Sequence, residues 1–154
     1  MHPRHQTVQD ALRDAGVDAR IQVLDDHART AVLAAEQLGC AVAAIANSLV
    51  FMADDVPLLV MASGAARVDT AVIAGAVGAA TVRKASADQV RAATGQAIGG
   101  VAPTGHPTRL RTLVDEDLRA HETVWAAGGT PDSIVPLTFD QLVTVTGGEV
   151  TRVR

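Results

Sequence analysis

Two apolar segments follow one another in the middle of the chain with only three residues between them, and this spacing constrains the fold most. Ser48–Met52 and Val56–Met61 both have the length and composition of strands. Asp54-Asp55 lies between them and favours a tight turn. We therefore predict a β-hairpin, which brings two antiparallel strands together without a crossover helix.

The remaining segments add helices and further strands. Helix signals, such as capping residues and apolar residues at helical spacing, fall on 6–15, 30–38, 69–77, 86–93 and 139–145, with single turns at 42–46 and 117–120. Strand signals fall on 21–24, 80–83, 110–114, 123–126 and 133–137, and residues 25–27 break the first of these strands. Because several strands are adjacent in sequence, we expect an α+β fold with a mixed sheet. Without a repeat or linker, residues 1–154 are expected to form a single domain.

The composition limits the classes of protein to which the chain can belong. Hydrophobic residues make up 48% of it but aromatic residues only 2%, so the core must be built from Ala, Val, Leu and Ile. The longest uncharged apolar run, Ala71–Ala80, is much shorter than the roughly 18 residues of a membrane span. No apolar stretch near the N-terminus indicates a signal peptide. We therefore expect a cytoplasmic protein with no membrane association.

The charge and the cysteine content exclude further classes. The net charge is −4, whereas a protein that binds a long nucleic-acid backbone usually has a basic surplus. Any contact with nucleic acid should therefore involve a short end, or depend on a partner. Cys40 is the only cysteine, which excludes an intramolecular disulfide and a multi-cysteine metal site. Its apolar surroundings favour a buried structural thiol.

The segment Gly99-Gly100-Val101-Ala102-Pro103-Thr104-Gly105-His106 is the strongest candidate for a functional site. Adjacent glycines let a ligand approach the main chain, where exposed amides bind an anion or an oxyanion. A plain tight turn is the alternative. The segment lacks the Gly-Lys-Ser/Thr of a phosphate-binding loop and the spacing of a dinucleotide fingerprint. His106 could contact a substrate or act as acid or base, or simply lie in solvent.

Three other polar residues stand where a site could form. Asn47 and Ser48 open a strand that we expect to be buried, so their side chains need partners from a ligand or from the backbone. Asp115 follows a predicted strand, where it either orients a group or, as its spacing favours, caps the next turn. No local signature indicates a Ser-His-Asp or Cys-His arrangement, or a metal site.

Six segments occur in an order that carries a resemblance. They are Thr30-Ala31-x-x-Ala34-Ala35 with Leu38-Gly39-Cys40, Ile45–Phe51, Ser63-Gly64 with Arg67-Val68-Asp69, Thr94-Gly95 with Ile98–Gly105, Val114-Asp115, and Ala127-Gly128-Gly129. Together they resemble the YbaK family, also called the prolyl-tRNA-synthetase-associated or editing domain, from about residue 30 to about residue 148.

The resemblance implies a fold and an activity. The implied fold is a twisted mixed sheet, partly barrel-like, with helices packed outside. The implied activity is hydrolysis of the ester in a mischarged aminoacyl-tRNA carrying a small amino acid, with no cofactor, no metal and no covalent nucleophile. The partners would be the tRNA acceptor end (the aminoacyl-adenosine) and, in some members, an aminoacyl-tRNA synthetase.

The resemblance also assigns site residues. Gly99 and Gly100 would donate backbone N–H groups to the tetrahedral intermediate, while the substrate's own hydroxyl assists a water molecule. Asn47 and Asp115 complete the predicted catalytic group. The predicted substrate-binding residues are Thr30, Ser48, Ser63, Gly64, Val101, Ala102, Pro103, Gly105, His106 and Gly128.

Asn47 stands where the family has a lysine. Asparagine donates a hydrogen bond without a charge, and charge-assisted hydrogen bonds are roughly twice as strong as neutral ones. Arg109 or Arg111 could supply the charge, the substrate could lack a nearby phosphate, or the domain could bind without catalysing. Two hypotheses follow: a free-standing trans-editing deacylase, or a non-catalytic module that binds an aminoacyl-adenosine-like ligand or a synthetase.

Overall fold

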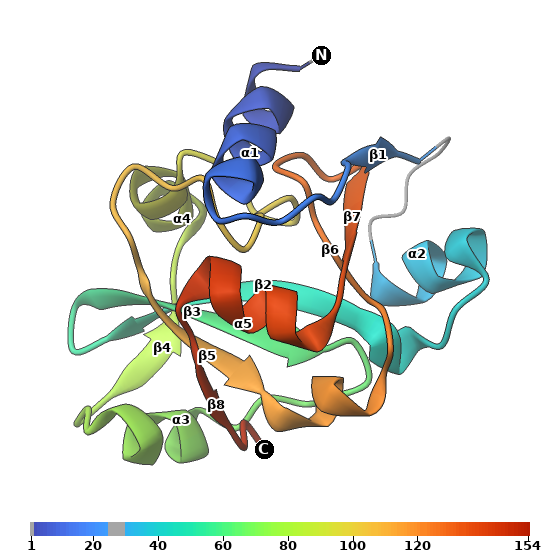
Figure 1. The fold of residues 1–154 in the computed structure, drawn as a ribbon. Coiled ribbons are helices and arrows are strands. Elements are labelled where there is room, and N and C mark those ends of the chain that lie inside the picture. Colours follow the sequence, from blue (N-terminus) through green and yellow to red (C-terminus); the bar gives the residue numbers. More distant parts are fainter. Residues whose placement is uncertain (1, 25–29) are drawn as a thin grey trace.

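A computed structural model describes residues 2–24 and 30–154, so the predicted break at 25–27 lies outside the described residues. Over these ranges the chain forms five α-helices and a mixed eight-stranded sheet (Figure 1). The elements are α1 (Pro3–Asp14), β1 (Gln22–Val23), α2 (Ala31–Leu38), β2 (Ile45–Ala53), β3 (Val56–Ser63), α3 (Thr70–Val77), β4 (Val82–Lys84), α4 (Ala87–Thr94), β5 (Arg111–Asp115), β6 (Val124–Ala126), β7 (Ser133–Leu137), α5 (Phe139–Thr146) and β8 (Glu149–Thr151). Two 3₁₀ turns, η1 (Val42–Ala44) and η2 (Glu116–Ala120), complete the list.

The predicted hairpin is confirmed and is longer than expected. β2 and β3 pair antiparallel without interruption from Ala46 opposite Ser63 to Ala53 opposite Val56. Asp54 and Asp55 connect them with φ values of 47° and 69°, the left-handed region that two-residue hairpin turns require. The hairpin therefore forms the centre of the sheet.

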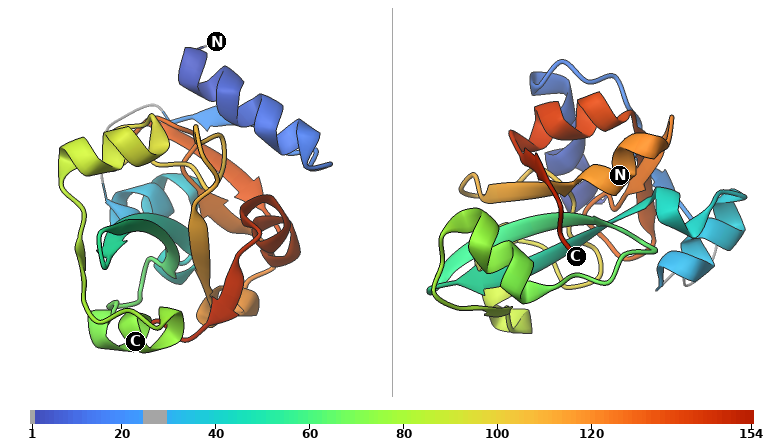
Figure 2. Two further views of the ribbon diagram at one scale, coloured as in Figure 1. Left: turned by 90° about the vertical axis from the view of Figure 1, so that its left-hand side faces the viewer. Right: turned by 90° about the horizontal axis from the view of Figure 1, so that it is seen from below.

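The sheet is mixed, as predicted, and its order is β1-β7-β6-β2-β3-β5-β8, with β4 also pairing with β2. The β2–β6, β3–β5 and β5–β8 pairs are parallel, whereas β1–β7, β6–β7, β2–β3 and β2–β4 are antiparallel. The sheet curves strongly in the two further views, and the helices lie around its outside (Figure 2).

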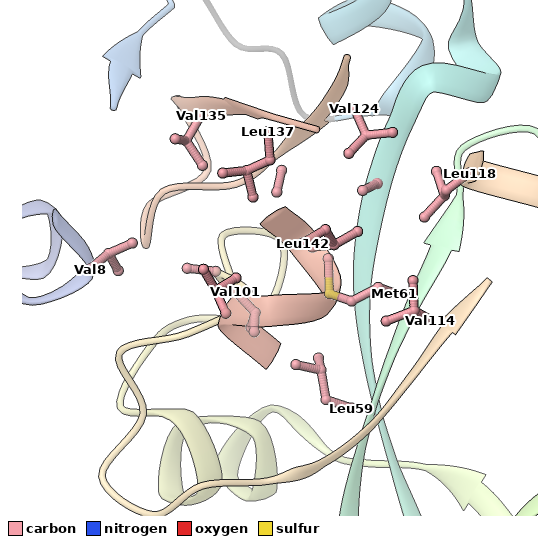
Figure 3. Close-up of a cluster of buried hydrophobic side chains, with 14 of the residues drawn as sticks. Val8, Leu59, Met61, Val101, Val114, Leu118, Val124, Val135, Leu137 and Leu142 are labelled. Carbon is pink, nitrogen blue, oxygen red and sulfur yellow. The ribbon is translucent and has the colours of Figure 1, made fainter. Parts of the chain in front are cut away.

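Small aliphatic side chains fill both faces of the sheet. The larger cluster joins α1, α4 and α5 to β3, β5, β6 and β7, and includes Val8, Leu59, Val114 and Leu142, all fully buried (Figure 3). A second cluster packs α3 onto the opposite face around Phe51. A third packs α2 against the start of β2. No helix in the described ranges is long and apolar enough to cross a membrane.

The helices follow their predicted capping signals closely. Thr30, Asp69, Ser86 and Thr138 each accept a backbone N–H of the first turn, and Ser86 and Thr138 form full capping boxes. Where the structure differs, local chemistry explains it. Helix α1 begins at Pro3 rather than residue 6, because His2 caps it and proline suits a first helical position. The predicted turn at 42–46 ends at Ala44, because Ile45 already pairs with β6.

Candidate active site

The two edges of β2 are paired differently. One edge is paired with β3 along nearly the whole strand. The other edge meets β6 only at Ile45 and Ala46, and β4 only at Phe51–Ala53, with one further bond from the Ala85 N–H to the Val50 carbonyl (Figure 1). Between these contacts no strand of the described residues pairs with the outer edge, and we call residues 47–49 the open section of β2.

A cavity of about 350 Å³ lies along this open section. Its described lining comes from α2, β2, the β4–α4 junction, the glycine-rich turn, β6 and the turn before β7. These residues are Leu24, Thr30, Ala31, Ala34, Ile45, Ala46, Asn47, Ser48, Leu49, Val50, Phe51, Lys84, Ala85, Val90, Ile98, Gly99, Val101, Trp125, Ala127, Pro131, Ser133 and Ile134. The cavity is therefore mostly apolar and long, because Ile45 and Phe51 are six residues apart and a strand rises about 3.3 Å per residue.

Hydrogen-bonding groups face the middle of the cavity. Backbone groups of alternate strand residues point to the same edge, and the Val50 carbonyl points to the β4 side, so those of Ser48 point to the open section. The Ser48 hydroxyl donates to the Met61 sulfur at 3.3 Å and keeps its lone pairs. The half-buried Asn47 side chain has no hydrogen-bond partner among the described residues. Asn47 and Ser48, which the sequence analysis named as site residues, both line the cavity.

The predicted substrate turn is divided between two sides of the protein. Gly99 and Val101 line the cavity, together with Ile98. Pro103, Thr104, Gly105 and His106 line a separate depression against α1 and α5. Ala102 is fully buried, and its N–H donates to the Gln96 side chain at 2.8 Å. The expectation that the whole turn faces one ligand is therefore corrected, because its second half packs on the core.

His106 holds the second half of the turn in place. Its Nε2 lies 2.8 Å from the Ala102 carbonyl oxygen, to which it donates. Burial lowers the pKa of His106, while the hydrogen bond to Ala102 opposes that shift. In this position the neutral imidazole is favoured. His106 stabilises the turn and does not line the cavity.

Gly100 has a structural role that the sequence did not reveal. Its N–H donates to the Ala97 carbonyl at 3.0 Å, so it is not free for an oxyanion. A Cβ atom at Gly100 would lie 2.6–2.8 Å from backbone atoms of Thr130 and Pro131. Gly99 has a φ of +89° and open space around it. The N–H groups of Gly99 and Val101 donate no hydrogen bond within the described ranges, which makes them the available donors in this turn.

Ser63, Gly64 and Asp115 meet at the far end of β3 and do not line the cavity. The Asp115 carboxylate accepts the N–H groups of Ser63 and Asp117, each at 3.0 Å, and so caps η2, as its spacing favoured. The Ser63 hydroxyl donates to the Ala43 carbonyl at 2.7 Å. A Cβ atom at Gly64 would lie 2.5 Å from the Val42 carbonyl oxygen. These residues position η1 and α2, and α2 forms part of the cavity wall.

Thr30 and Gly128 support the opposite wall. Thr30 lines the cavity, but its hydroxyl is used to cap α2 at the Leu33 N–H. Gly128 lies beside the lining residue Ala127 and donates to the Ser133 hydroxyl at 3.0 Å. The same hydroxyl donates to the Thr130 carbonyl at 2.7 Å. The turn before β7 is thereby held against the cavity.

Most lining residues were not predicted as site residues by the sequence analysis, among them Lys84 and Trp125. Lys84, at the end of β4, and Trp125, on β6, have no motif around them and reach the cavity only through strand pairing. The suggestion that Arg109 or Arg111 supplies a charge is wrong. Arg111 binds Glu149 and the Val77 carbonyl at the opposite end of β5, and Arg109 lies at the separate depression.

Comparisons with known proteins agree with this fold. A sequence model described as the aminoacyl-tRNA editing domain matches residues 25–145. The uncharacterized protein YwhH of Bacillus subtilis (strain 168) is 34% identical over 110 residues, which are 71% of this chain and 69% of YwhH. The crystal structure of a candidate trans-editing enzyme for prolyl tRNA synthetase has a TM-score of 0.95 and 38% identity, covering 100% of this chain and 98% of its own. The crystal structure of the hypothetical protein APE2540 has a TM-score of 0.87 and 26% identity, covering 96% and 98%.

Proposed function

We propose that this chain, which belongs to the aminoacyl-tRNA editing domain family, is a free-standing trans-editing hydrolase. It would cleave the ester that joins a small, wrongly attached amino acid to the terminal adenosine of a tRNA. The observation that carries the proposal is the cavity along the open section of β2, where Asn47, Ser48 and the glycine-rich turn meet. The similarity of this chain to the crystal structure of a candidate trans-editing enzyme also supports the proposal.

The cavity suits ester hydrolysis by a positioned water molecule. No histidine, cysteine or carboxylate lines it among the described residues, so the described lining has none of these groups to activate a serine or threonine hydroxyl as a covalent nucleophile. An aminoacyl ester is already activated, and the main requirement is stabilisation of the developing oxyanion. Preorganised backbone donors provide that stabilisation, and loss of one typically costs about 2.7–4 kcal/mol of barrier. We assign this role to the N–H groups of Gly99, Val101 and Ser48, instead of the occupied Gly100 N–H.

Asn47 has a distinct place in this proposal. Its side-chain amide is unpaired within the described part of the chain, and Asn47 lines the cavity next to Ser48 in the open section. An amide both donates and accepts, so it can orient the hydroxyl of the terminal ribose, which in turn assists the water molecule. Asn47→Ala should therefore lower kcat more than it raises KM.

The test is deacylation of alanyl-, cysteinyl- and seryl-tRNA, including these amino acids on tRNAPro because of the neighbour's description. Purified protein should accelerate ester loss for at least one of them, and Asn47→Ala should remove most of that rate. Cys40→Ala is the matched control, because Cys40 does not line the cavity. Absence of acceleration with every substrate, or equal loss in the Cys40 variant, would overturn the proposal.

A binding module without catalysis is the second candidate, and one observation favours it. The described lining offers a single ionisable side chain, Lys84, and no histidine, cysteine or carboxylate for proton transfer. Asn47→Lys separates the two functions. If the natural protein is inactive and Asn47→Lys creates deacylation, the natural protein is a binder. If Asn47 supports activity that lysine abolishes, the protein is a hydrolase whose site is adapted to asparagine.

A further inference from the structure

Lys84 is the only charged residue among the described residues that line the cavity. It is also the only lysine of a chain whose net charge is −4. Its side chain has no ion pair or hydrogen bond with any described residue. A cation left unpaired at the end of a mostly apolar cavity favours a ligand that brings its own anionic group.

Two other cations, Arg83 and Arg111, each have a partner within the protein. Arg83, next to it on β4, lies 3.7 Å from the Asp55 carboxylate and donates to the Gln89 side chain at 3.3 Å. Arg111 binds the Glu149 carboxylate at 3.2 Å. Among the described residues, Lys84 alone thus carries a charge that is both unneutralised and placed at the cavity.

Strand pairing fixes the side of the sheet on which Lys84 lies. Lys84 is directly opposite Phe51 in the antiparallel β2–β4 pair, so the two side chains share one face. Asn47 lies on that same face, because side chains alternate with a period of two along β2. Lys84 therefore borders one end of the open section. Ser48, in the middle, is three residues from Phe51, about 10 Å along the strand.

The chemistry of an aminoacyl-tRNA end decides which group meets this charge. The carboxyl group of the amino acid is consumed in the ester, so phosphates are the only anionic groups of the ligand. The free amino group is cationic and is repelled by Lys84. The aminoacyl part is therefore directed to the other end of the cavity, where Ala31, Ala34 and Trp125 provide a small apolar wall.

We propose that Lys84 binds the 5′-phosphate of the terminal adenosine and thereby sets the direction in which the acceptor end lies along β2. The phosphate lies at the β4 end, the ester at the open section and the amino acid beside α2. This inference rests on the proposed function for the identity of the ligand, but Lys84 acts in binding and orientation rather than in bond breaking.

The experiment compares adenosine 5′-monophosphate (AMP) with adenosine by calorimetry at low salt, for the wild-type protein, Lys84→Met, Lys84→Arg and Arg83→Met. The wild-type protein should bind AMP about tenfold more tightly than adenosine, the effect of one charge-assisted contact. Lys84→Met should lose that preference and leave adenosine binding unchanged. Lys84→Arg should keep it, and so should Arg83→Met, which removes the same charge from the adjacent position.

Several outcomes would overturn the inference. These are absence of AMP binding to the wild-type protein, equal binding of inorganic phosphate and AMP, an unchanged preference in Lys84→Met, or the same loss in Arg83→Met. Deacylation assays distinguish this failure from failure of the proposed function. Activity that Lys84→Met leaves unaltered in KM rejects the role of Lys84 only. A phosphate preference that depends on Lys84, in a protein that deacylates nothing, rejects the hydrolase and supports the binding role.

Discussion

The two edges of β2 show how one strand serves stability and function at once. Its β3 edge is paired continuously, and the residues of β3 there are almost all buried. Within the described part of the chain, its outer edge is unpaired over the open section, between short contacts to β6 and β4, and the cavity lies along that section. The comparison shows that the site lies where no described strand pairs with the outer edge of β2. The backbone groups that a neighbouring strand would satisfy are available to a ligand.

The largest effect is expected on the paired edge. Leu59 is fully buried in the larger core cluster, so Leu59→Ala should lower the free energy of unfolding by about 2–5 kcal/mol. Urea denaturation measures this change. Val56→Ala, on the same strand but 62% exposed, is the control and should stay within about 0.5 kcal/mol of wild type. Similar losses in both variants would contradict the assignment of stability to this edge.

The wall opposite the open section should show the next largest effect. Gly100→Ala places a methyl group against the backbone of Thr130 and Pro131, which cannot easily move, and should cost about 1–3 kcal/mol of stability. Any accompanying loss of activity would then follow from a displaced wall. Gly75→Ala is the matched control. It lies inside α3 with nothing near its Cβ position and should raise stability by about 0.4–1 kcal/mol.

A pH-dependent effect is expected where α1 meets the same wall. The Thr130 hydroxyl donates to Asp132 at 2.6 Å and accepts from His5 Nε2 at 2.7 Å. Burial is the main cause that lowers the pKa of His5 from about 6.5, and burial lowers that of His106 too. The unfolded chain therefore binds more protons than the folded one just below pH 6.5.

Their contribution to stability should be complete above pH 6.5 and should decrease as the pH falls through the lowered folded-state pKa values. Unfolding free energies between pH 7.5 and pH 5 would show this decrease. The double variant His5→Gln/His106→Gln should be less stable at pH 7.5 but should vary less with pH. An unchanged pH dependence in that variant would reject the assignment.

The smallest change in stability is expected at the open section itself. The Ser48 hydroxyl makes only one weak hydrogen bond, to the Met61 sulfur, so Ser48→Ala should alter the unfolding free energy by less than about 0.5 kcal/mol. AMP affinity or deacylation should still decrease, because Ser48 lines the cavity and its hydroxyl keeps its lone pairs for a ligand. A loss of unfolding free energy larger than the loss of binding or activation free energy would contradict the difference between the two edges of β2.

Local chemistry explains why most of the fold was predictable. Thr138 and Gln141 specify the start of α5 within four residues, and the Asp54-Asp55 turn specifies the hairpin in the same way. Strand β8 was missed because three residues after two glycines carry too weak a signal, and its parallel partner β5 lies far away in the sequence. Asn47, Ser48 and Gly99 were predicted site residues that the cavity brings together.

The sequence by itself determined the element order up to α5, the mixed sheet and the presence of a glycine-rich turn, because caps, turns and apolar spacing act over a few residues. Only the tertiary structure decided which half of that turn faces the cavity, since contacts of Gly100 with Thr130 and of Gly105 with Val8 join distant segments. It also decided that the unpaired charge at the cavity is Lys84 and not an arginine after the turn. That outcome depends on strand register, which pairs residue 84 with residue 51 and has no local signature.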